Sequence, residues 1–65
     1  MKFIKVRVLP DNKEQIINLT MIKRIIPDGK TSEGENKYEL KFEGTDIVLS
    51  EKEARKVFAA IGVGF

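Results

Sequence analysis

The chain contains no histidine, no cysteine and no tryptophan in its 65 residues. Histidine is the usual general base near neutral pH, cysteine is the usual thiol nucleophile, and both are common zinc ligands. Without these side chains the chain can form neither a disulfide nor a Cys/His zinc site. We therefore expect a protein that is not an enzyme, with no catalytic residue, no cofactor, no metal and no small-molecule substrate.

The chain also lacks any long apolar run. No stretch approaches the roughly 20 apolar residues of a membrane-spanning helix. Residues 1–9 alternate apolar and basic side chains, whereas a secretory signal has a continuous apolar segment. These two features predict a cytoplasmic protein without a membrane partner.

A length of 65 residues fits one small domain spanning residues 1–65. Domains of this size bury only about 60% of the surface of the unfolded chain, so their stability is marginal. Small folds usually compensate with disulfides, a metal or association. Since the first two are not expected here, the length favours a homo-oligomer or another protein partner.

Alternating apolar side chains predict strands at residues 2–9, 14–18, 22–26, 37–43 and 47–49. A turn at residues 10–13 joins the first two, and Asn18 and Thr20 favour a break at residues 19–21. Pro27 cannot donate to a strand ladder, so it is expected to end the third strand. Residues 28–36 carry no apolar side chain and are expected to form a long polar loop.

The C-terminal part predicts a helix over residues 50–61. Ser50 and Glu53 have the spacing of a capping box, in which each side chain bonds a backbone N–H of the other residue. Gly62 is a typical helix stop. Apolar residues at helical spacing form one face, namely Ala54, Val57, Phe58 and Ile61.

Together these elements predict an α+β fold. It comprises a small antiparallel β-meander of about five short strands, or a curled half-barrel, with one C-terminal amphipathic helix.

The proposed function class is a small non-enzymatic interaction module that self-associates. More apolar side chains are available than the predicted core positions use, and such an excess is typical of a subunit interface. The candidate interface residues are Phe3, Leu9, Ile16, Ile26, Val63 and Phe65.

The alternative is a small nucleic-acid-binding protein. Residues 1–30 carry seven basic and three acidic side chains, whereas residues 31–65 carry five basic and seven acidic ones. Basic strands with an exposed aromatic residue bind single strands by phosphate pairing and base stacking. The candidate contacts are the basic residues of the first strand and of the third, namely Lys2, Lys5, Arg7, Lys23 and Arg24.

Three segments carry a family resemblance: residues 16–25 (IINLTMIKRI), 38–44 (YELKFEG) and 47–53 (IVLSEKE). Together with the preceding turn at residues 10–12, their order resembles that of the FlbD-like family of flagellar-associated proteins over residues 3–58. The resemblance implies a small bacterial non-enzymatic protein, and it assigns no individual site residue.

Overall fold

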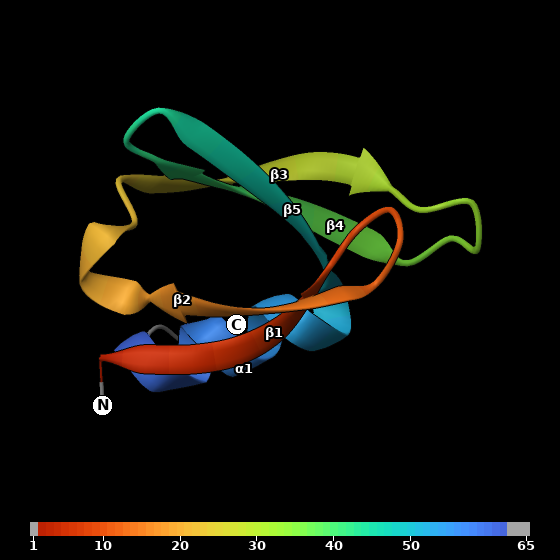
Figure 1. Ribbon diagram of the computed structural model, residues 1–65. Coiled ribbons are helices and arrows are strands. Elements are labelled where there is room, and N and C mark those ends of the chain that lie inside the picture. The colour runs from red at the N-terminus through yellow and green to blue at the C-terminus, as the bar shows by residue number, and fades with distance from the viewer. Residues whose placement is uncertain (1, 63–65) are drawn as a thin grey trace.

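The computed structural model describes residues 2–62 as five strands, one short 3-10 helix and one α-helix (Figure 1). The elements in chain order are β1 (Phe3–Val8), β2 (Lys13–Asn18), η1 (Leu19–Met21), β3 (Arg24–Lys30), β4 (Asn36–Phe42), β5 (Thr45–Ser50) and α1 (Glu51–Ile61). The α+β class, the antiparallel strands and the C-terminal helix are as predicted.

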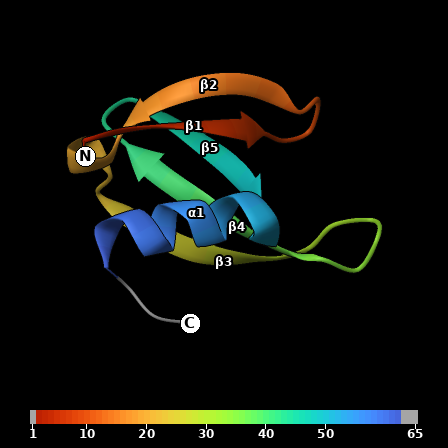
Figure 2. The same cartoon turned by 90° about the horizontal axis from the view of Figure 1, so that it is seen from below.

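The strands form two antiparallel sheets, β1–β2 and β3–β4–β5. Among residues 2–62 a single bridge joins them, in which the Leu9 N–H donates to the Val48 carbonyl over 2.9 Å. Viewed as in Figure 2, the strands follow one another in space as β2, β1, β5, β4 and β3. The sheets therefore curl together without closing into a barrel, because β2 and β3 are not paired.

The break between β2 and β3 is the predicted one. The Asn18 side chain accepts hydrogen bonds from the Thr20 N–H (3.0 Å) and the Thr20 hydroxyl (2.7 Å), and it thereby caps η1. Such a local bond competes with continuation of the strand. The chain consequently leaves β2 after Asn18 and starts a new sheet.

The prediction that Pro27 ends the third strand is wrong. β3 continues to Lys30, and Pro27 lies opposite Tyr38 of β4. Proline is tolerated on an edge strand, where its missing N–H costs no ladder bond, and β3 is the outer strand of its sheet.

The polar loop is also shorter than residues 28–36, because the β3–β4 hairpin extends to the pair Lys30–Asn36. The connection is closed by two backbone bonds, from the Thr31 N–H to the Glu35 carbonyl (2.7 Å) and from the Gly34 N–H to the Thr31 carbonyl (3.0 Å). Backbone pairing needs no apolar side chain, so polar composition alone did not show where the strands end.

The helix ends as predicted but begins differently. Gly62 has a left-handed backbone (φ 84°), and its N–H donates to backbone carbonyls of the last helical turn. At the start, Ser50 is extended and makes no side-chain capping bond. The expected capping box does not form, because the Glu53 carboxylate accepts a hydrogen bond from the Arg7 N–H of β1 instead.

The core lies between the curled sheets and α1. The helix packs on β4, β5 and β1 through Ala54, Val57 and Phe58. Leu40 of the central strand β4 and Leu49 of β5 are fully buried. The Tyr38 and Phe58 rings meet edge to face with centroids 5.4 Å apart, a favoured aromatic arrangement.

Candidate interaction surface

The β1–β2 hairpin presents one face to the exterior, which we call the outer face. The register pairs Phe3 with Asn18, Lys5 with Ile16 and Arg7 with Glu14. Directly paired residues point to the same side of a sheet, and the alternate pairs point to the other side. The outer face therefore consists of Phe3, Lys5, Arg7, Glu14, Ile16 and Asn18, while Ile4, Val6 and Val8 face the core.

Two predicted interface residues meet on the outer face. Phe3 is 52% exposed and Ile16 is 69% exposed. They lie diagonally across the hairpin, because Phe3 is two residues before Lys5, the partner of Ile16. Diagonal neighbours are within reach of an aromatic side chain. Phe3 and Ile16 are thus diagonal neighbours on the outer face, and we call the two together the apolar patch.

The other predicted interface residues lie elsewhere. Leu9 is half-buried at the bridge to β5, and Ile26 is half-buried in β3, opposite Glu39. Val63 and Phe65 lie outside the described residues. The structure therefore brings together only Phe3 and Ile16 of the described candidates.

Two further exposed apolar residues were not singled out as interface candidates. Met21, at the end of η1, is 55% exposed, and Ile61, in the last turn of α1, is 41% exposed. The apolar periodicity of the helix places Ile61 on the core face, but the sheet does not cover the last turn. No sequence signal distinguished Met21, because its exposure depends on how η1 turns the chain.

Met21 contributes to a shallow groove beside β2, with a volume of about 330 Å³. The groove lies between β2 and the β4–β5 hairpin. Its lining includes the consecutive β2 residues Gln15, Ile16, Ile17 and Asn18, together with Phe42 and Ile47 on the opposite side. Because consecutive residues of a strand point to alternate faces, a groove that touches all four runs along the strand's edge.

The basic candidates separate into two groups. Lys5 and Arg7 are exposed on the outer face, and Lys2 is exposed just before β1. The Arg7 guanidinium lies 3.7 Å from the Glu14 carboxylate, so part of the local positive charge is balanced.

The second basic group lies at the start of the other sheet. Lys23 and Arg24 are exposed, and the Lys23 ammonium is 2.9 Å from the Glu43 carboxylate. Each group thus includes a basic side chain that is already paired with a carboxylate, and the two groups belong to different sheets.

Glu53 is the one buried charged residue among residues 2–62, with 6% of its surface exposed. Its Oε1 atom accepts a hydrogen bond of 2.9 Å from the Arg7 N–H, and the Lys56 ammonium lies 3.1 Å from its Oε2 atom. Burial alone would raise the pKa of Glu53, but these two donors together hold it below its ordinary value. The carboxylate is therefore ionised at neutral pH and joins α1 to the edge of β1.

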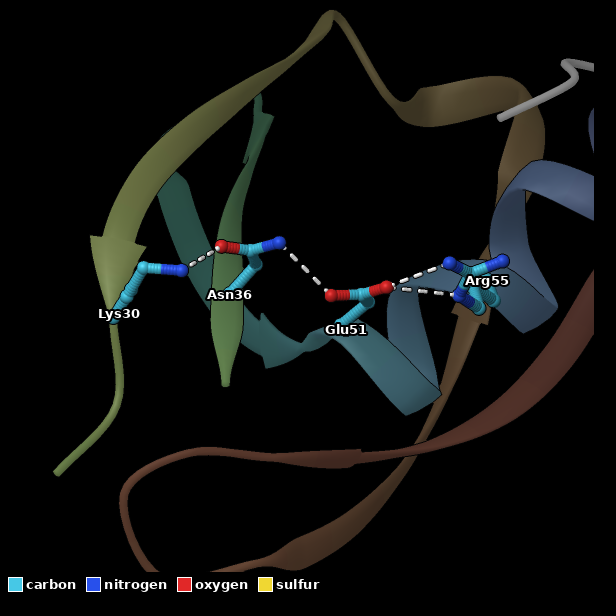
Figure 3. A network of polar contacts seen from close by, with 4 residues as sticks. All are labelled: Lys30, Asn36, Glu51 and Arg55. Carbon is cyan, nitrogen blue, oxygen red and sulfur yellow. Dashed lines mark hydrogen bonds and ion pairs between the residues drawn. The ribbon is translucent and has the colours of Figure 1, made fainter. Parts of the chain in front are cut away.

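A second polar network joins the β3–β4 hairpin to the start of α1 (Figure 3). The Lys30 ammonium donates to Asn36 Oδ1 (2.9 Å), and Asn36 Nδ2 donates to Glu51 Oε1 (3.0 Å). The Arg55 guanidinium binds Glu51 Oε2 at 2.7 Å, and this bond, followed by that from Asn36, lowers the pKa of Glu51. The network fixes the helix start; its members are exposed or half-buried.

Within the described chain, no three or more acidic side chains converge in a way that could hold a metal ion. None of the described helical residues form a segment long and apolar enough to cross a membrane. Neither a protein-family model, nor a curated protein, nor a solved structure matches this sequence significantly. The resemblance to the FlbD-like family therefore stays a prediction.

Proposed function

We propose that this chain is a small non-enzymatic interaction module that self-associates. The observation that supports it is the apolar patch of Phe3 and Ile16, two large side chains 52% and 69% exposed on one hairpin. Full burial of such a side chain is worth about 1.5–3 kcal/mol. In a domain this small, burial against a second copy adds substantially to a modest core.

The proposal includes a cytoplasmic location, which cell fractionation would test. It also includes bacterial origin, which the resemblance to the FlbD-like family implies, and a non-catalytic role, as expected from the missing histidine and cysteine.

Sedimentation of the pure protein tests self-association. We expect a mass above that of the 7.4 kDa monomer at micromolar concentration. Ile16→Lys should weaken association at least tenfold, because tenfold corresponds to about 1.4 kcal/mol, less than the value of a buried Ile. Lys30→Met, at the end of β3 in the other sheet, is a control, and it should leave the mass unchanged. A monomer at all concentrations would contradict the proposal.

Sedimentation also distinguishes self-association from the alternative, which is nucleic-acid binding by the basic residues. With added single-stranded DNA, such binding would weaken steeply with salt, and the double variant Lys5→Glu, Arg7→Glu would abolish it. Association between copies through an apolar patch should instead change little with salt.

A further inference from the structure

The outer edge of β2 carries unpaired backbone groups. The Leu19 N–H donates to the Lys2 carbonyl, so the backbone N–H and C=O groups of Leu19 point toward β1. The N–H and C=O groups of successive residues point to opposite edges of a strand. In β2 the odd-numbered residues therefore turn their backbone groups to β1, whereas Glu14 and Ile16 turn theirs away from it. Among residues 2–62, no strand pairs with this side of β2.

The other edges of the two sheets are protected. On the far side of β1, the Arg7 N–H is bonded by the Glu53 carboxylate, and the Leu9 N–H is bonded by Val48. The edge of β3 contains Pro27 and a register shift between Pro27 and Lys30. Proline, bulges and covering elements are the usual devices that prevent edge-to-edge pairing. The edge of β2 contains neither a proline nor a bulge, and among residues 2–62 no strand covers it.

The surroundings of this edge are apolar and accessible. The groove beside β2 runs along it, with Phe42 and Met21 on its walls. Ile16, in the middle of the edge, is the most exposed large apolar side chain of the described chain. A strand placed here would gain backbone hydrogen bonds and cover apolar surface at the same time.

We propose that a second copy of this chain adds its own β2 to this edge, antiparallel and centred on Ile16. This inference rests on the proposed function, because it specifies where self-association takes place. The two copies would form a continuous four-stranded sheet in the order β1–β2–β2–β1. Ile16 of each copy would donate its N–H to the Ile16 carbonyl of the other.

The sequence of β2 fits its own copy in this register. Two-fold symmetry requires that the central residue lies opposite itself. Centring on Glu14 would bring two carboxylates together, and centring on Gln15 would place Glu14 opposite Ile16. Centring on Ile16 joins the two isoleucines and places Glu14 opposite the neutral Asn18. Lys13 and Glu14 also cancel in charge, so the two edges do not repel each other.

Two variants at one position separate the backbone from the side chain. Ile16→Pro removes the outward N–H but leaves the ladder to β1 intact, so we expect at least a tenfold weaker dimer. Ile16→Thr keeps the N–H and the β-branched shape, and a smaller loss is expected. Ile61→Thr, the same change at another exposed isoleucine, is the matched control and should leave the dimer unchanged. Circular dichroism would establish that each variant is folded.

Amide hydrogen exchange of the wild-type chain is a second test, and it does not require that the Ile16→Pro variant folds. The Ile16 amide should exchange quickly in dilute protein and at least tenfold more slowly at concentrations that give dimer. A dimer in which the Ile16 amide still exchanges quickly, or one that Ile16→Pro leaves intact, would overturn the edge pairing but not self-association. A wild-type chain that stays monomeric would overturn both.

Discussion

Removing the Glu53 carboxylate should cost this domain a large share of its stability. Glu53→Ala leaves the Arg7 N–H without its partner at a nearly buried site. A hydrogen bond to a charged group contributes about 1.5–3 kcal/mol. The partly exposed ion pair with Lys56 adds about 0–1 kcal/mol. We expect a loss of about 2–4 kcal/mol, whereas a chain of this length has a total of about 3–10 kcal/mol.

The assay is urea unfolding followed by circular dichroism, with two further variants. Glu53→Gln keeps an acceptor oxygen and loses only the charge, so it should cost about 1 kcal/mol. Glu43→Ala removes a carboxylate of an exposed ion pair, and it should change stability by less than about 0.5 kcal/mol. Equal unfolding midpoints for Glu53→Ala and Glu43→Ala would refute the structural role of Glu53.

The same measurement against pH tests the ionised state of Glu53. Its pKa in the folded protein lies below the ordinary value of 4.5. A lowered folded pKa means that the carboxylate contributes stability fully above the unfolded pKa, and that this contribution is lost as the pH falls through the folded pKa. The advantage of the wild type over Glu53→Gln should therefore be constant near neutral pH and shrink below about pH 4.5. An advantage that grows on acidification would contradict the assignment.

Three other predictions follow from the fold. Leu40→Ala, at a fully buried position, should lower the free energy of unfolding by about 2–5 kcal/mol without a change in the urea m-value, and a loss under 1 kcal/mol would show that the sheet centre is loosely packed. Gly62→Ala should cost about 1–2 kcal/mol because of the left-handed backbone, whereas D-alanine there should cost nothing; equal costs would exclude a backbone cause. Asn18→Ala should remove the cap of η1 and cost about 1 kcal/mol in thermal unfolding, and Asn18→Asp should retain most of it.

Much of this fold could be predicted because its signals are local. The alternation along β4, the break after Asn18 and the stop at Gly62 each depend on a few neighbouring residues. The apolar helix face was right except at Ile61, where the sheet ends before the helix does.

The errors share a different cause, since each depended on an element distant in sequence. Pro27 can remain within a strand only because β3 is an edge, which the sequence of β3 does not state. Glu53 has the spacing of a capping residue, yet β1 supplies a donor from a position 46 residues away. A carboxylate in the first turn of a helix can bond whichever N–H lies nearest, and tertiary packing decides which one that is.

The candidate site shows the same division. Alternation in β1 and β2 was enough to place Phe3 and Ile16 on exposed positions of one hairpin once their register was known. Which edge remains open follows instead from the order of the strands. A closed barrel would need β3 to pair with β2, but η1 ends β2 and directs the chain into the other sheet. The proposed second copy would therefore occupy the place beside β2 that a barrel of this chain would have given to β3.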